Sequence, residues 1–326
     1  MPVHTDKAPI DSFFYAINGN PPPERASGGY MTAPDGKRIR YACFGAGGRP
    51  LNGTVIILPG RNECIEKYFE TVRDLSDRGL GSAIMDWRGQ GGSDRLLRDK
   101  HRGHVKSFFE YTRDLDQFFE EIVLPDCRGP YYVLAHSTGA LIALLGSHSM
   151  VNRVRRMVLV VPFLGFTGTP FSMTTIHRMT SILSKVGLGG LYAAWGPRET
   201  VPFDNNKLTS DPARYRRNCR LYDTYPQLSL GGPTVAWVRA ACEASRIVQE
   251  PEFMAAIQVP ILFIGAGADE IVSTAAATRY ARRLRGGSLL MIDGARHEIL
   301  QEADAYREQF FAAFDAYVPG AEEVLA

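Results

Sequence analysis

The sequence of 326 residues lacks the features that mark membrane-spanning and secreted proteins. No stretch approaches the roughly 18 consecutive apolar residues that a bilayer-spanning helix needs. Residues 1–23 contain no apolar core of the kind found in signal peptides. We therefore expect a cytoplasmic protein, either free in solution or bound peripherally to the inner membrane.

Paired cysteines, excess charge and nucleotide-binding motifs are missing as well. The five cysteines are odd in number, widely scattered and without a CxxC pair, which argues against a disulfide framework or a zinc site. With 37 basic and 35 acidic residues, the chain lacks the basic excess typical of nucleic-acid-binding proteins. Neither GxGxxG nor GxxxxGK[ST] occurs. The sequence therefore predicts no cofactor, no metal and no nucleic-acid partner.

What the chain does contain is an alternation of apolar strands and amphipathic helices. Apolar runs at 54–58 and 157–161 are typical of strands covered on both faces, and residues 81–86 are expected to form another strand. Apolar residues spaced three and four apart predict helices at 63–78 and 107–123. This order predicts an α/β fold with a mostly parallel central sheet and helices on both faces.

A nucleophile is predicted at Ser137. The serine follows a strand-like run at 131–134 and precedes a helix-like run at 140–145. Small residues two positions before and after it, Ala135 and Gly139, let neighbouring backbone pass close by. This pattern is typical of a nucleophile elbow, in which a sharp strand-to-helix turn lifts the hydroxyl clear of the sheet.

Two further residues complete a predicted Ser-His-Asp triad. Asp269 lies just past a strand-like run at 259–265, and His297 follows another at 288–292. The order Ser, Asp, His is the one that α/β-hydrolases use. The carboxyl ends of parallel strands gather functional groups at one edge of a sheet. Glu270 and Asp293 are the alternative acids, whereas His136 is expected to pack behind the sheet.

From about residue 30 to 314 the chain resembles monoacylglycerol lipases and bacterial lysophospholipases of the α/β-hydrolase superfamily, above all the membrane-associated lysophospholipases of Gram-negative bacteria. The matching segments are LPGRNE at 58–63, DWRGQGGSDR at 86–95, HRGHV at 101–105, AHSTG at 135–139, GADEIV at 267–272 and GARHEILQE at 294–302. Monoacylglycerol lipases usually carry His-Gly where this chain has Pro59-Gly60, which favours the lysophospholipase side.

The sequence also predicts two donors for the oxyanion and, where the alternation of strands and helices stops after residue 161, an inserted lid. One oxyanion donor is the backbone N–H of Thr138, which follows the nucleophile, and the LPGRNE match places the other at the backbone N–H of Arg61. We expect residues 1–27 to be an N-terminal extension, 28–161 and 248–326 the hydrolase core, and 162–247 an inserted, mainly helical lid.

In the lid, a stripe that includes Ile176, Met179 and Leu183 repeats at helical spacing. We expect these three residues to contact the acyl chain of the substrate. The alternative is that the stripe packs the lid onto the core.

The predicted activity is hydrolysis of carboxylic esters of single-acyl lipids, lysophospholipids first and monoacylglycerols second, through an acyl-enzyme. An aminopeptidase or a general carboxylesterase of the same fold is the alternative. The lid holds more arginine than acid, however, which argues against binding a substrate amine. A non-catalytic binding protein on a hydrolase scaffold is a more remote alternative.

Arginines cluster at 214–220 and 153–156, either on solvated faces or in peripheral contact with an anionic membrane surface. The sequence leaves open the acyl-chain length, the headgroup, the oligomeric state and the resting position of the lid.

Overall fold

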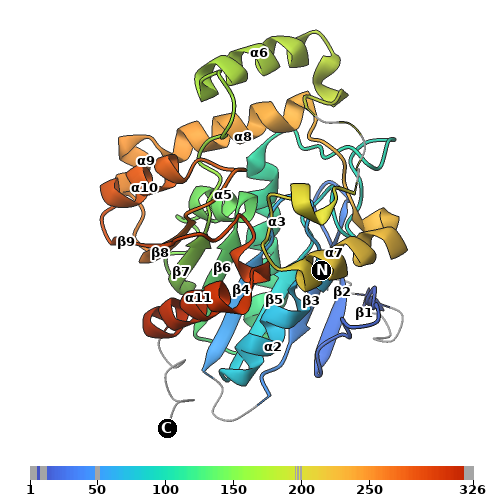
Figure 1. Ribbon diagram of the computed structural model, residues 1–326, viewed down its shortest axis with the longest axis vertical. Coiled ribbons are helices and arrows are strands. Elements are labelled where there is room, and N and C mark those ends of the chain that lie inside the picture. The colour runs from blue at the N-terminus through green and yellow to red at the C-terminus, as the bar shows by residue number, and fades with distance from the viewer. Residues whose placement is uncertain are drawn as a thin grey trace.

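The computed structural model describes residues 6–7, 13–47, 52–194, 196, 198 and 200–318. Its centre is a nine-stranded sheet in the order β1-β2-β3-β5-β4-β6-β7-β8-β9 (Figure 1). The strands are β1 Asp6–Lys7, β2 Ala26–Thr32, β3 Arg38–Phe44, β4 Gly53–Leu58, β5 Leu80–Met85, β6 Tyr131–His136, β7 Val154–Val160, β8 Ile261–Ala266 and β9 Gly287–Ile292. β1, β2 and β3 pair antiparallel, and all pairs from β5 to β9 are parallel. The predicted α/β architecture is confirmed.

The helices follow the strands in the expected alternation. They are η1 Ile65–Tyr68, α2 Phe69–Asp77, α3 Phe108–Phe118, η2 Phe119–Val123, α4 Leu124–Asp126, α5 Thr138–Leu145, α6 Met173–Lys185, η3 Leu188–Gly190, η4 Phe203–Asn205, α7 Pro212–Thr224, η5 Pro226–Leu228, α8 Val235–Val248, α9 Pro251–Ala255, α10 Thr274–Arg283, η6 Ile299–Gln301 and α11 Asp304–Tyr317. In Figure 1, α2 and α11 lie in front of the sheet, and α3 and α5 lie behind it.

The central strands are apolar along their whole length because helices cover both faces of the sheet. Every residue of β4, β5 and β8 is buried. The buried side chains of the sheet and its helices form one large hydrophobic core. A sheet buried in this way gives the carboxyl ends of its strands a rigid base for a site.

The residues predicted as a lid, 162–247, form α6, α7 and α8. The amphipathic helix α8 belongs to the main core, to which it contributes Trp237, Ala241 and Val248. By contrast α6 lies on the outer side of α8, at the top of Figure 1, and Thr180 is its one buried residue. The segment therefore combines a core helix with an outer helix.

The predicted N-terminal extension, 1–27, is described only in part, since residues 1–5 and 8–12 lie outside the described residues. Phe13 and Phe14 are buried against the core, and β2 begins at Ala26. The described part of this segment is thus packed on the core formed by the sheet and its helices.

Candidate active site

Ser137 lies on a strained turn between β6 and α5. Its φ of 51° is in the left-handed region, which is unusual for a residue with a side chain. The turn is held because the Ser137 N–H donates to the Val160 carbonyl at 2.9 Å and the Ser137 carbonyl accepts from the Phe163 N–H at 3.1 Å. A Cβ at Gly139 would lie 2.2 Å from the Leu58 carbonyl oxygen, so only glycine fits there. The nucleophile elbow predicted from the sequence is therefore present in the backbone.

The three residues predicted as a triad meet at the carboxyl edge of the sheet. His297 Nε2 lies 3.1 Å from Ser137 Oγ, and His297 Nδ1 lies 2.8 Å from Asp269 Oδ2. The side chain of Asp269 is fully buried, and its Oδ1 accepts the Ile271 and Val272 N–H groups. The alternative acid Glu270 instead pairs with Lys207 on the surface.

The carboxyl of Asp269 is held in its ionised form. Burial alone would raise its pKa, but the hydrogen bond and charge of His297, with the two backbone N–H groups, lower it below the usual value. An ionised Asp269 that accepts from Nδ1–H leaves Nε2 of His297 to accept the proton of Ser137. The arrangement can therefore activate the serine hydroxyl.

Arg61 and Thr138, the predicted oxyanion donors, occupy adjoining segments. The glycine after Thr138 packs directly on the carbonyls of Leu58 and Pro59, which lead into Arg61. Among the described residues, no hydrogen-bond acceptor is found for the N–H of either residue, whereas the neighbouring Gly60 and Asn62 N–H groups donate to side chains. Within the described ranges, both predicted donors are thus left available for a ligand.

A buried cluster of charged residues behind the triad was not predicted. Glu63 accepts from Gly60 N–H, from Tyr68 Oη at 2.6 Å and from Lys67 Nζ at 2.8 Å. Lys67 also binds Glu298, the neighbour of His297, at 2.6 Å. This Glu63 cluster, formed by Glu63, Lys67, His136, Glu298 and Tyr68, ties the oxyanion segment to the segment that carries His297.

His136 belongs to this cluster, although the sequence predicted only packing for it. Its Nδ1 lies 3.2 Å from Glu63 Oε2 and its Nε2 lies 3.1 Å from the carbonyl oxygen of His297. Both ring nitrogens face oxygen atoms that can accept hydrogen bonds, and this arrangement favours the imidazolium form. Burial alone would lower the pKa of His136, but the charge and hydrogen bond of Glu63 raise it. The charged residues in the segment 63–67, which lies shortly after an apolar strand, are the sequence feature from which this cluster could have been predicted.

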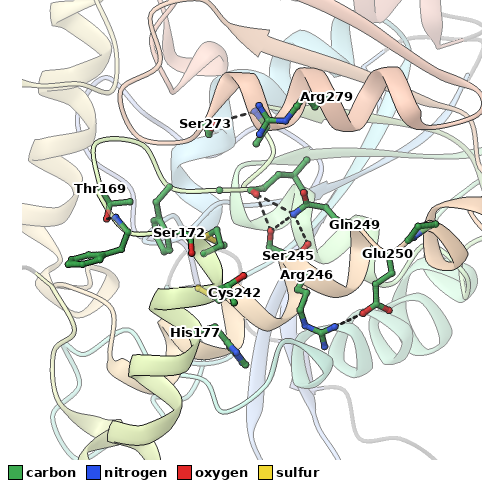
Figure 2. A pocket seen from close by; sticks show the side chains of 18 residues that line it. Thr169, Ser172, His177, Cys242, Ser245, Arg246, Gln249, Glu250, Ser273 and Arg279 are labelled. Carbon is green, nitrogen blue, oxygen red and sulfur yellow. Dashed lines mark hydrogen bonds and ion pairs between the residues drawn. The ribbon is translucent and has the colours of Figure 1, made fainter.

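The residues predicted to contact the acyl chain all lie on α6 but differ in environment. Ile176 packs against the main core, whereas Met179 and Leu183 are 50% and 37% exposed. A cavity of about 620 Å³ lies between the starts of α6 and α10 and the end of α8 (Figure 2). Its apolar lining includes Leu164, Phe166 and Met173. None of the three predicted residues lines it.

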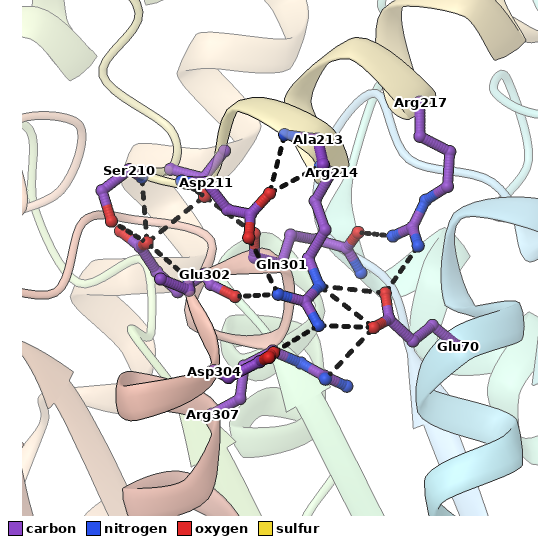
Figure 3. A network of polar contacts seen from close by, with 12 residues as sticks. Glu70, Ser210, Asp211, Ala213, Arg214, Arg217, Gln301, Glu302, Asp304 and Arg307 are labelled. Carbon is purple, nitrogen blue, oxygen red and sulfur yellow. Dashed lines mark hydrogen bonds and ion pairs between the residues drawn. The ribbon is translucent and has the colours of Figure 1, made fainter.

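Two of the clustered arginines are bound inside the protein. Arg214 and Arg217 of α7 both donate to the carboxylate of Glu70 on α2 (Figure 3). Arg153, from the second cluster, pairs with Glu120 at 2.8 Å. Arg214 and Arg217 are thus partly buried ion-pair partners, whereas the pair of Arg153 with Glu120 lies at the surface.

The described residues contain neither a metal-binding cluster nor a membrane-spanning helix. In the ranges that the structure describes, no group of three or more His, Cys, Asp or Glu side chains could hold a metal ion. Within the same ranges, no helix has the length and apolar character needed to cross a membrane.

Comparisons with known proteins agree with this geometry. The model of the family described as serine aminopeptidase, S33, matches residues 49–304. The chain is 33% identical over 294 residues to lysophospholipase L2 of Escherichia coli K12, covering 85% of this chain and 83% of that protein. It is 28% identical over 266 residues to probable lysophospholipase L2 of Haemophilus influenzae, covering 81% of this chain and 83% of that protein.

Solved structures of low sequence identity share the fold. A soluble variant of monoglyceride lipase from Saccharomyces cerevisiae superposes with a TM-score of 0.72 at 19% identity, covering 90% of this chain and 94% of that one. Monoacylglycerol lipase from Paleococcus ferrophilus gives a TM-score of 0.69 at 20% identity, covering 86% and 99%. The chain therefore belongs to the α/β-hydrolase family described as serine aminopeptidase, S33, within its lysophospholipase and monoacylglycerol lipase group.

Proposed function

We propose that this protein is a serine hydrolase that cleaves the carboxylic ester of single-acyl lipids, lysophospholipids first and monoacylglycerols second. The observation that carries the proposal is the hydrogen-bonded chain from Asp269 through His297 to Ser137 on a strained elbow. The substrate class is supported by the relatives, which are named as lysophospholipases.

The reaction begins with attack by Ser137 Oγ on the ester carbonyl carbon while His297 Nε2 accepts the hydroxyl proton. Negative charge develops on the carbonyl oxygen, where the N–H groups of Arg61 and Thr138 donate to it. Collapse of the tetrahedral intermediate breaks the bond to the glycerol oxygen, which takes the proton from His297. The acyl group is then bound to Ser137 as an ester.

Water completes the cycle by the same route. His297 accepts a proton from water, whose oxygen attacks the acyl-enzyme. Collapse of the resulting intermediate breaks the bond to Ser137 Oγ and releases the fatty acid, while His297 returns the proton to Ser137 Oγ. Asp269 remains ionised throughout, holds the tautomer of His297 and stabilises the imidazolium that forms twice per turnover.

Charge pairing around α7 and α8 supports an ester substrate over a peptide with a free amine. An aminopeptidase needs carboxylates that are available to the substrate ammonium group. Asp211 pairs with Arg214, Asp223 with Arg198 and Glu243 with Arg239. Three of the four described acids of the insertion, all but Asp204, therefore already have cationic partners.

The outer helix α6 supports the part of the proposal that concerns lipid aggregates. Met179, Ile182 and Val186 are 50%, 64% and 65% exposed, which is unusual for large apolar side chains on one helix. In this proposal α6 is the movable part of the lid, and its exposed side chains meet the acyl chains at a micelle or an inner-membrane surface.

Labelling and turnover test the proposal together. A fluorophosphonate probe is expected to label Ser137 alone, and Ser137→Ala is expected to abolish both labelling and hydrolysis while the melting temperature is unchanged. The substrates are lysophosphatidylcholine, lysophosphatidylethanolamine, monoacylglycerol and an aminoacyl amide. Labelling of another serine, or preferential cleavage of the amide, would contradict the proposal.

A further inference from the structure

The guanidinium group of Arg61 is a largely buried cation that contacts a carbonyl group and an aromatic ring. Its Nη2 donates to the Gly231 carbonyl, and its Cζ lies 5.6 Å from the centre of the Trp237 ring. Its Nε is inaccessible and has no hydrogen-bond acceptor. Among the residues that the structure describes, no carboxylate forms an ion pair with Arg61.

Other enclosed cations of this chain are paired with acids. Arg40 binds Glu66 and Asp86, and Lys67 binds Glu63 and Glu298. Burying a cation without an anion is strongly unfavourable. Burial lowers the pKa of Arg61 to about 10, so the side chain is still charged at neutral pH. Arg61 is therefore a charged side chain without an anionic partner among the described residues.

A chain of contacts links the unpaired cation of Arg61 to the triad. Trp237, on which the guanidinium lies, contacts Phe163, and Phe163 N–H donates to the Ser137 carbonyl. On another side Gly103 leaves room for the guanidinium, since a Cβ there would lie 2.8 Å from Nη2. Arg61 as a whole is only half-buried, so part of its surface is open to an entering molecule.

We propose that Arg61 binds the phosphodiester of a lysophospholipid, so that one residue contacts both functional groups of the substrate. This inference rests on the proposed function. The backbone N–H of Arg61 donates to the ester carbonyl oxygen, and its guanidinium donates to the non-bridging phosphate oxygens. Arginine suits this role because its planar fork of donors matches phosphate.

The proposal explains a preference between two substrate classes. A lysophospholipid carries a phosphodiester a short glycerol unit away from its ester, and this anion neutralises Arg61. A monoacylglycerol presents only hydroxyl groups there and leaves the guanidinium unpaired. The enzyme should therefore favour lysophospholipid over a monoacylglycerol of the same acyl chain.

The test is the ratio of kcat/KM for lysophosphatidylcholine to kcat/KM for the monoacylglycerol with the same acyl chain. Arg61→Gln keeps the backbone N–H but removes the charge, and it should lower this ratio about tenfold or more. Arg61→Lys, which keeps the charge without the fork, should lie between Arg61→Gln and wild type. Arg102→Gln is the matched control, because Arg102 already pairs with Asp99 at 2.9 Å. Its ratio should equal that of wild type.

A binding assay on the wild-type protein tests the proposal without relying on the folding of a variant. Glycerophosphocholine should slow fluorophosphonate labelling of Ser137 at concentrations where glycerol and inorganic phosphate do not. Equal protection by inorganic phosphate would identify a free-phosphate site and overturn the headgroup assignment. Equal protection by glycerol would show that the anion is not recognised at all.

The outcomes separate this inference from the proposed function. If wild type cleaves lysophospholipids and Arg61→Gln keeps the wild-type ratio, the role of Arg61 is wrong and the proposed function stands. If wild type cleaves simple esters but no lysophospholipid, the proposed substrate class is wrong. If Arg61→Gln does not fold, the labelling assay on wild type decides.

Discussion

At the scale of single residues, backbone strain is concentrated beside the nucleophile. Ser137 has a φ of 51° and Val161, just past β7, has a φ of 42°. A β-branched residue rarely adopts a positive φ, because its side chain crowds the backbone. The two residues are linked through the Val160 carbonyl, which accepts from Ser137 N–H. The packed ends of β6 and β7 hold both residues in this conformation, and the strain presents the hydroxyl of Ser137 to His297.

The triad should behave as one unit in kinetics. His297→Ala and Asp269→Asn are each expected to lower kcat by about 10⁴-fold, because each removes the activation of Ser137. Adding Ser137→Ala to either variant should cost little more. Single-turnover measurements with an activated ester give these rates. A near-normal rate for Asp269→Asn would mean that the acid lies elsewhere, with Asp293 or Glu270 the next residue to replace.

His136 should act as a positioning residue rather than a catalytic one. His136→Gln cannot satisfy both Glu63 and the His297 carbonyl in the same way, so His297 should lose part of its alignment. We expect kcat to fall by about 10- to 100-fold with little change in KM, as for a small misplacement of reacting groups. His148→Gln, an exposed histidine that stacks on Phe253, is the control. A rise in KM at constant kcat would show that His136 serves substrate binding instead.

At the scale of elements, α6 is held by the inner helix α8 and faces outward with apolar side chains. Met179→Asp and Leu183→Asp should therefore leave the melting temperature nearly unchanged. They should lower kcat/KM for laurate esters far more than for butyrate esters, since each buried methylene of a long chain contributes up to about 0.8 kcal/mol.

Ile176→Asp provides the internal contrast on the same helix. Because Ile176 packs on the core, its replacement should lower the melting temperature and reduce turnover of both esters equally. If Met179→Asp and Leu183→Asp gave this same pattern, the stripe would only pack the lid, and contact with the acyl chain would be excluded.

Elements with a strong local signal could be predicted, and elements defined by distant contacts could not. The apolar runs at β4 and β8 predict buried strands, and the elbow can be recognised from a short stretch of sequence. The sequence also placed Asp269 and His297 because each follows its own strand. By contrast, the Glu63 cluster joins Glu63 to the neighbour of His297 across more than 200 residues, and the division between α6 and α8 depends on which helix reaches the core. Neither the contacts of the Glu63 cluster nor the packing of α8 on the core can be inferred from a local sequence pattern.

At the scale of the whole molecule, one carboxylate joins three distant parts of the chain. Glu70 on α2 accepts from Arg214 and Arg217 on α7 and from Arg307 on α11 (Figure 3). Arg214 also reaches Asp304 at the start of α11. This network connects the second half of the insertion to the core. In the first half, α6 packs on α8, and its Met173 and Ile176 reach the main core.

The Glu70 network should make stability depend on pH in a defined direction. Burial alone would raise the pKa of Glu70, but the hydrogen bond of Arg214 and the charges of Arg217 and Arg307 lower it to about 2. A glutamate in an unfolded chain has a pKa of about 4.3. Since the folded state binds this proton more weakly, the stabilisation is fully present above that value and is lost as the pH falls toward 2.

Glu70→Gln should consequently lower the free energy of unfolding by about 2 kcal/mol at pH 7, because charged hydrogen bonds to three arginines are lost. The difference between wild type and variant should shrink in urea titrations as the pH is lowered from 5 to 3. Glu120→Gln is the matched control, because Glu120 is 61% exposed and pairs only with Arg153 among the described residues. Such an exposed pair contributes little, so this variant should stay within about 0.5 kcal/mol of wild type at every pH. A deficit of Glu70→Gln that stayed constant with pH would show that packing, and not the charge of Glu70, connects α7 to the core.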